Sequence, residues 1–120
     1  MKNISHAATI LRVTDMETSL KFYPNILGFT ATYIHEDPAS YAELRLNDTS
    51  IHLSLNKKSM PAGPAIYFFI HDVDAVWRSI RENYEGEMTE PVLWDYNMRD
   101  FEVQDPSGNR LIFGKHVDQG

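Results

Sequence analysis

The sequence predicts an α+β fold of two tandem βαβββ units, with curled mixed sheets around a concave groove and the helices on the outer face. The first observation is a repeat: Asp15 and Asp72 lie 57 residues apart, and each follows a strand-like segment and opens a helical pattern. The second concerns "ELRLND" and "DFEVQD", which both alternate as strands before a turn. Their final aspartates, Asp48 and Asp105, have the same spacing. The chain therefore looks like two copies of one unit.

The first unit begins with residues 6–13, which alternate as a strand. Asp15 is a candidate N-cap for the helix that follows, and Gly28 ends that helix. Pro24 should kink or end its last turn because proline removes a backbone donor. The apolar stripe of this helix is Met16, Leu20, Tyr23 and Leu27. Three strands are predicted near 29–36, 40–47 and 50–56.

The second unit repeats this order, with a strand at 65–71 and Asp72 as N-cap. Its helical stripe is Val73, Val76, Trp77, Ile80 and Tyr84. The later strands are predicted near 87–93, 99–104 and 109–114, and the last two are joined by a turn at "DPSG". The chain of 120 residues is thus a single domain, with units over 1–57 and 64–117 and a linker over 56–64.

Alternation sorts the strand residues into two faces. Leucine, isoleucine, valine and phenylalanine side chains, such as Leu11, Leu53, Phe101 and Phe113, should meet the helices. The concave face mixes aromatic rings with charges, unlike a core or a plain exterior. Its members are Ala8, Ile10, Arg12, Tyr41, Glu43, Arg45, His52, Ala65, Tyr67, Phe69, Asp100, Glu102, Arg110 and Ile112.

Composition excludes several classes of function. The net charge is −6, and no Lys/Arg cluster exists beyond Lys57-Lys58, so we expect no nucleic-acid partner. No apolar stretch is long enough to span a bilayer, and the N-terminal apolar run ends at Arg12, unlike a secretory signal. The chain has no cysteine. These features predict a cytoplasmic protein without a membrane partner.

Three segments carry a family resemblance: "FYPNILGF", "HDVDAVW" and "RDFEVQDPSGNRLIFG". Together with the βαβββ repeat, they resemble the vicinal oxygen chelate superfamily. That superfamily includes glyoxalase I, extradiol dioxygenases, and the fosfomycin and bleomycin resistance proteins. The resemblance covers essentially the whole chain.

The superfamily's enzymes hold a divalent metal with four side chains on the concave face, one from each of four strands. The resemblance places these positions on Ala8, His52, Ala65 and Ile112. Three of the four lack the nitrogen or oxygen atom that a metal ligand needs. We therefore expect no metal, no cofactor and no catalytic residue, while His6, His35 and His52 leave an unusual metal site open.

The metal-free branch typified by bleomycin resistance proteins is the closer match, through "IHLS" and the long loop before "RDFEVQDPSGN". Members of that branch are homodimers that trap a large glycopeptide in grooves at their interface and perform no chemistry. Aromatic rings sandwich the flat part of the drug, and acidic groups attract its cationic tail. The resemblance implies a homodimer that binds a flat, cationic, antibiotic-like small molecule.

The candidate ligand-binding residues follow from this resemblance and from the face assignment. The ring after "LGF" falls on Tyr33, and the tryptophan of the second unit's first strand falls on Tyr67. The family's loop aromatic is replaced by Asn97, which has Trp94 and Tyr96 as neighbours. The whole set is Tyr33, Tyr41, His52, Tyr67, Phe69, Trp94, Tyr96, Glu102, Arg110 and Ile112.

Alternatives to this interpretation stay open. Tyr67 and Phe69 alternate with apolar residues and could belong to a strand that is buried on both faces. Charged residues such as Glu102 and Arg110 could lie on a solvated face. The chain could also be an enzyme of the glyoxalase or dioxygenase type, with an atypical or absent metal site.

Overall fold

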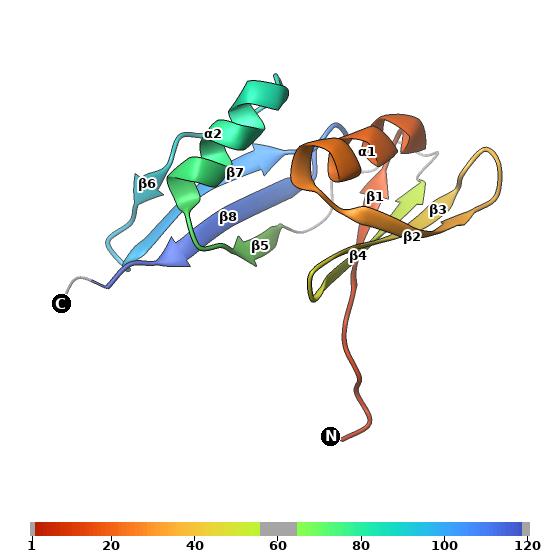
Figure 1. The fold of residues 1–120 in the computed structure, drawn as a ribbon, viewed down its shortest axis with the longest axis horizontal. Helices are drawn as coiled ribbons and strands as arrows, with labels where there is room; N and C mark the ends of the chain where they lie inside the picture. Colours follow the sequence, from red (N-terminus) through yellow and green to blue (C-terminus); the bar gives the residue numbers. More distant parts are fainter. Residues whose placement is uncertain (1, 56–64, 119–120) are drawn as a thin grey trace.

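The computed structural model describes residues 2–55 and 65–118, and it has the predicted α+β architecture of two βαβββ-like units (Figure 1). The first unit contains β1 (Thr9–Val13), α1 (Met16–Phe22), the π-helical turn η1 (Tyr23–Leu27), β2 (Thr30–His35), β3 (Tyr41–Leu46) and β4 (Thr49–Leu55). The second contains β5 (Ile66–Phe69), α2 (Val73–Asn83), β6 (Val92–Leu93), β7 (Met98–Gln104) and β8 (Arg110–His116). The predicted linker over 56–64 lies outside the described residues.

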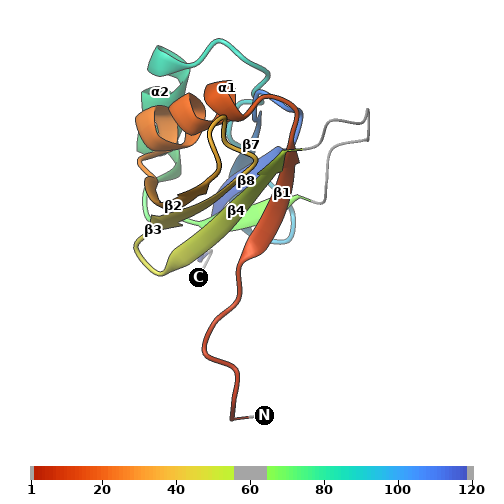
Figure 2. The ribbon, with the colours of Figure 1, turned by 90° about the vertical axis from the view of Figure 1, so that its right-hand side faces the viewer.

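Each unit forms one four-stranded mixed sheet. The strand orders are β1-β4-β3-β2 and β5-β8-β7-β6. Within each sheet the first pair, β1 with β4 or β5 with β8, is parallel, and the other pairs are antiparallel. Both helices lie on the same side of the two sheets (Figures 1 and 2), so the opposite, inner face is left uncovered by helices. No helix in the described ranges is long and apolar enough to cross a membrane.

The core lies between the sheets and the helices, as the alternation predicts. Its most buried strand side chains are Leu11, Val13, Leu44, Ile51, Leu53, Phe101, Val103, Leu111 and Phe113. Stacked rings continue through the second sheet, because Phe113 lies parallel to both Phe101 and Phe68, with ring centroids 5.4 and 5.0 Å away. Burying this apolar surface is the main force that holds each helix on its sheet.

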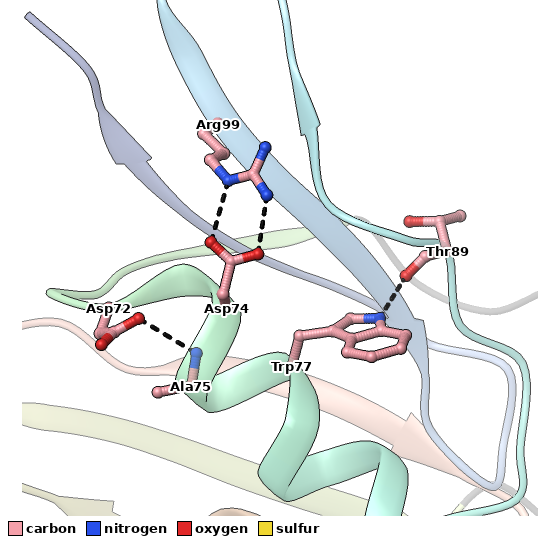
Figure 3. Close-up of polar contacts among 6 residues, drawn as sticks. All are labelled: Asp72, Asp74, Ala75, Trp77, Thr89 and Arg99. Atoms are coloured by element: carbon pink, nitrogen blue, oxygen red, sulfur yellow. Dashed lines mark hydrogen bonds and ion pairs between the residues drawn. The ribbon is translucent and has the colours of Figure 1, made fainter.

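Both helices begin at the predicted N-caps. The Asp15 carboxylate accepts a hydrogen bond from Thr18 N at 3.1 Å, and the Asp72 carboxylate accepts one from Ala75 N at 3.0 Å (Figure 3). These bonds satisfy backbone donors that a helix start leaves without partners. At the other end of the first helix, the turn containing Pro24 is π-helical, and Gly28 ends it with φ of +88°. The predicted effect of Pro24 is thereby confirmed.

An ion pair attaches α2 to the sheet beneath it. Nε and Nη2 of Arg99, on β7, donate to the two carboxylate oxygens of Asp74 at 3.2 and 2.7 Å (Figure 3). The hydrogen bond from Arg99 is the main reason that the pKa of Asp74 is below its ordinary value of 3.8. This two-point geometry fixes the start of the helix relative to β7.

A buried polar network joins the two units. The Tyr23 hydroxyl, from the first unit, donates to Asp105 Oδ2 at 2.7 Å in the turn between β7 and β8. Asn109 Nδ2 donates to the same oxygen at 3.0 Å and to the backbone oxygen of Arg12, in β1, at 2.8 Å. Tyr23, Asp105 and Asn109 are all buried. Burial and the Asp105 charge raise the pKa of Tyr23, so its hydroxyl remains a donor.

The structure corrects two predicted strands. Only Val92–Leu93 of the segment predicted over 87–93 is a strand, and a single bridge joins Met88 to Val103. Pro91 interrupts the segment because it has no backbone N–H for the ladder. The strand predicted from residue 6 begins at Thr9, whose partner is Ile51 near the start of β4, so few partners remain for the residues before it.

The second landmark of the repeat is confirmed in outline, because Asp48 and Asp105 each lie in a turn that follows a strand, but the two turns differ. Asp48 lies in the short turn between β3 and β4 and is exposed, whereas Asp105 is buried in the longer turn at 105–109. The strand register instead places Glu43 opposite His52 in the first sheet and Glu102 opposite Ile112 in the second. The units correspond, but their hairpins differ in turn length.

Replacing Tyr23 with phenylalanine should destabilise the protein by about 1–3 kcal/mol, because the buried Asp105 carboxylate loses a donor. Urea unfolding of Tyr23→Phe and of the parent protein would measure the difference. Tyr96→Phe, which removes an exposed hydroxyl, is the matched control. Equal losses in the two variants would contradict the assigned role of the network.

Candidate functional site

One cavity on the inner face of the second sheet collects most of the second unit's candidate residues. Its volume is ≈ 520 Å³, and it opens between β5, β7, β8 and the segment that carries β6. The lining residues are Tyr67, Thr89, Glu90, Val92, Trp94, Tyr96, Asp100, Glu102, Arg110 and Ile112. The lining therefore combines three aromatic rings with three carboxylates and one guanidinium.

Asp100 links the two sides of the aromatic lining. Its Oδ2 accepts a hydrogen bond from the Tyr67 hydroxyl at 2.9 Å, and its Oδ1 accepts one from Trp94 Nε1 at 2.8 Å. Burial and the bond to Asp100 raise the pKa of Tyr67 above its ordinary value of 10, so the phenol stays protonated and donates. The rings of Trp94 and Tyr96 are parallel, with centroids 6.1 Å apart.

Gly114, on β8, provides the space in which Tyr67 lies. A Cβ atom at this position would collide with the Tyr67 hydroxyl and would come 2.7 Å from the Asp100 Cβ. Gly114 also pairs with Asp100 in the ladder between β7 and β8. The Tyr67 ring therefore crosses β8 at the one level where that strand has no side chain.

The charges in the cavity do not cancel. Arg110 Nε and Nη2 both donate to Glu102 Oε1, at 2.9 and 2.7 Å, and this bond raises the pKa of Arg110. That pair is internally neutral. Glu90 and Asp100 make no ion pair with any residue in the described ranges. The lining is therefore net negative, which favours a cation.

The rim of the cavity is fixed by helix α2 through Thr89. Trp77, on α2, donates its Nε1–H to the Thr89 backbone oxygen at 2.9 Å (Figure 3). Thr89 N donates to Glu102 O at 2.9 Å, and Glu102 N donates to Thr89 Oγ1 at 2.8 Å. The Trp77 ring packs against the core, as its place on the helical stripe predicts.

The other candidate residues lie outside this cavity. On the first sheet, the Tyr41 hydroxyl hydrogen-bonds His52 Nδ1 at 2.7 Å, and His52 Nε2 lies 3.3 Å from a carboxylate oxygen of Glu43. Tyr33 is bonded to His35 at 2.8 Å on the neighbouring strand β2. Phe69 contacts the Tyr67 ring, with centroids 4.9 Å apart, but it is 77% exposed.

The described residues include no group of three or more His, Cys, Asp or Glu side chains that could hold a metal ion. Glu43 lies beside His52, but the residue opposite His52 on β1 is Ile10, whose side chain has no atom that could bind a metal. His6 bonds to Ser5 on the exposed segment before β1. Ile112, at the fourth superfamily position, lies level with Tyr67 and Glu102.

Two other hollows are similar in size but differ in lining. One, of ≈ 630 Å³, lies between the start of α1 and the β2–β3 turn, and another, of ≈ 560 Å³, surrounds the start of α2. Neither is lined by a phenylalanine, tyrosine or tryptophan from the described part of the chain. The aromatic cavity on the second sheet is therefore the better candidate for recognising an organic ligand.

The chain belongs to the Glyoxalase/Bleomycin resistance protein/Dioxygenase superfamily, whose family model matches residues 3–113. The matched residues span both βαβββ-like units. No curated protein sequence matches the chain at a significant level.

Several solved structures share the fold. An integron cassette protein from the mobile metagenome of the Halifax Harbour sewage outfall has a TM-score of 0.80 and 19% identity, over 93% of this chain and 99% of that one. A bleomycin-binding protein from Streptomyces verticillus, complexed with copper(II)-bleomycin, has a TM-score of 0.78 and 20% identity, over 98% and 100% of the two chains. A bleomycin resistance determinant encoded on transposon Tn5 has a TM-score of 0.79 and 16% identity, over 94% and 98%.

Four lining residues of the cavity were not among the candidates, and neither was Gly114 beside it; the four are Thr89, Glu90, Val92 and Asp100. Asp100 was assigned to the concave face by alternation, but nothing in the sequence indicated that it bonds two aromatic residues. Gly114 could have been found from its position directly after "RLIF". A glycine that interrupts an alternating strand often marks a place where another group approaches the backbone closely. Thr89 and Glu90 lie in the segment mispredicted as strand.

Proposed function

We propose that this protein is a non-catalytic binding protein that sequesters a flat, cationic, antibiotic-like small molecule on its inner face. The observation that carries this proposal is the cavity in which Tyr67, Trp94 and Tyr96 accompany a net negative lining. Aromatic faces attract both flat rings and cations, each contact contributing about 0.5–2 kcal/mol. Several such contacts in one cavity would give useful affinity without any chemical step.

Similarity to bleomycin-binding proteins supports the ligand class. The structures from Streptomyces verticillus and transposon Tn5 match nearly the whole chain in fold. At 20% and 16% identity, they leave the ligand of this chain open, so a bleomycin-type drug is one member of the proposed class.

We further propose that the working form is a homodimer. The inner face exposes large apolar side chains, among them Ile10, Phe69 and Tyr96, which are 56%, 77% and 60% exposed. Such exposure is typical of a surface that is covered by another molecule. Pairing of two inner faces could bring the first-sheet candidates Tyr33, Tyr41 and His52 of one chain toward the cavity of the other.

An enzymatic function of the glyoxalase or dioxygenase type is the second candidate. It is favoured by the contact of His52 with Glu43 on the inner face of the first sheet, since imidazole and carboxylate are common metal ligands. Ala8, Ala65 and Ile112 argue against it, because these side chains carry no donor atom at the other superfamily positions.

Titration with bleomycin or with 1-methylquinolinium, a small flat cation, should quench tryptophan fluorescence, because Trp94 lines the cavity. Tyr67→Ala should raise the dissociation constant about tenfold, which corresponds to about 1.4 kcal/mol. Ile34→Ala, on the exposed end of β2, is the control and should leave the constant unchanged. Equal affinity of the Tyr67→Ala variant and the parent protein would remove Tyr67 from the site.

Analytical ultracentrifugation should give a mass twice the 13.8 kDa of one chain. Phe69→Glu should shift the protein toward monomer, because it places a charge on the exposed inner face. Ile34→Glu is the matched control: Ile34 pairs with the buried Ala42 and therefore lies on the helix side of its sheet. A monomeric parent protein would contradict the dimer.

Metal analysis of protein purified without chelators should find less than stoichiometric nickel, zinc, iron or manganese, because three of the four superfamily positions lack a donor atom. Plasma mass spectrometry would measure this. One tightly bound ion per chain, lost in His52→Ala, would favour the enzymatic candidate over the binding protein.

A further inference from the structure

We propose that Asp100 and Gly114 are positioning residues that together order the aromatic wall of the inner-face cavity. The wall consists of Tyr67, Trp94 and Tyr96. This inference rests on the proposed binding function and adds to it the residues that set the geometry of the site. It assigns Asp100 a role other than that of a simple counter-ion for a cation.

The relevant residues lie on successive strands of the second sheet. Tyr67 is on β5, Gly114 on β8 and Asp100 on β7, while Trp94 directly follows β6. Asp100 is paired with Gly114 on one side and with Val92, on β6, on the other. A line of contacts therefore crosses the whole sheet, from Tyr67 over Gly114 to Asp100 and on to Trp94.

Gly114 allows the first contact in this line, that between Tyr67 and Asp100. Because it has no side chain, the Tyr67 ring can lie across β8 and its hydroxyl can reach Asp100 Oδ2. Any larger residue would have to push Tyr67 off β8, since its Cβ would meet the end of the ring and the Asp100 Cβ. The bond between Tyr67 and Asp100 thus requires a glycine at position 114.

Asp100 forms the second contact in this line, that with Trp94. Each of its oxygens accepts a different ring donor, so one rigid carboxylate fixes Tyr67 and Trp94 relative to each other. The loop is held as well, because Trp94 N donates to Met98 O at 2.8 Å and Asn97 N donates to Trp94 O at 3.0 Å. Tyr96, parallel to Trp94, extends the ordered surface.

Ordering the rings before a ligand arrives lowers the entropy lost on binding, which is the general benefit of preorganisation. Hydrogen bonds to a charged acceptor are strong enough to hold the half-buried Tyr67 and the exposed Trp94 side chain. Removing the Asp100 carboxylate should therefore weaken the binding of any flat ligand, charged or neutral. A counter-ion would instead matter only to a cation.

The first measurement needs no ligand. In a ¹H–¹⁵N spectrum, the indole N–H signal of Trp94, assigned with Trp94→Phe, should move in Asp100→Asn, because a neutral amide replaces the charged carboxylate acceptor and offers one acceptor oxygen instead of two. It should also move in Gly114→Ala, which leaves every polar group in place. Asp95→Asn, which removes an exposed charge next to Trp94, should leave it unmoved. The indole signal of Trp77, bonded to Thr89, is the internal reference.

The second measurement compares two probes of the same shape by calorimetry at neutral pH: 1-methylquinolinium, a cation, and quinoline, which is neutral. Asp100→Asn should raise both dissociation constants, that of quinoline about tenfold and that of 1-methylquinolinium by more, because the variant also loses one of the two unpaired carboxylates. Gly114→Ala, which removes no charge, should raise both by a similar factor. Asp95→Asn should change neither by more than about twofold.

Three results would decide against the proposal: an unmoved Trp94 signal in Asp100→Asn, a loss confined to the cationic probe, or an equal loss in Asp95→Asn. If Gly114→Ala fails to fold, Asp100→Asn still decides. If the parent protein binds neither probe, the proposed function fails for flat aromatic ligands, while the Trp94 signal still tests whether Asp100 orders the wall.

Discussion

The arrangement of the two units depends on the hydrogen bonds to the buried carboxylate of Asp105. This carboxylate accepts hydrogen bonds from Tyr23, from Ser107 N and twice from Asn109, and Asn109 also reaches the backbone of β1. A carboxylate without these donors would be costly to bury. Because the donors come from both units, satisfying this one charge requires the units to take one relative position, and that position sets the two inner faces beside each other.

The fold could be predicted from the sequence because its signals are local. Asp15 and Asp72 each begin a helix through a bond to a residue three positions later, and the alternation of apolar residues reports directly on burial. The errors have equally physical causes. Pro91 breaks a segment whose apolar pattern resembles a strand. The equal spacing of Asp48 and Asp105 gave no indication that the turns containing them differ in length.

The candidate site was only partly accessible to the same reasoning. Tyr67 was found through the family resemblance and its place on the inner face, and Trp94 and Tyr96 as neighbours of the position that the family's loop aromatic occupies. The structure brings all three to one cavity. Tyr33, Tyr41 and His52 lie on the other sheet, and whether they contribute depends on a second chain. The contacts of Asp100 join residues on non-adjacent strands, and no local pattern in one sequence encodes such a bond.

The glycine at position 114 also makes the two units unequal. At the corresponding level of the first sheet, Ser54 stands between Arg12 and Tyr41, whereas Gly114 stands between Phe69 and Asp100. A ring cannot lie across Ser54 as Tyr67 lies across Gly114, since serine has a Cβ. Among the described residues, the aromatic lining therefore gathers on the second sheet, and the proposed binding function would then take up one ligand per chain.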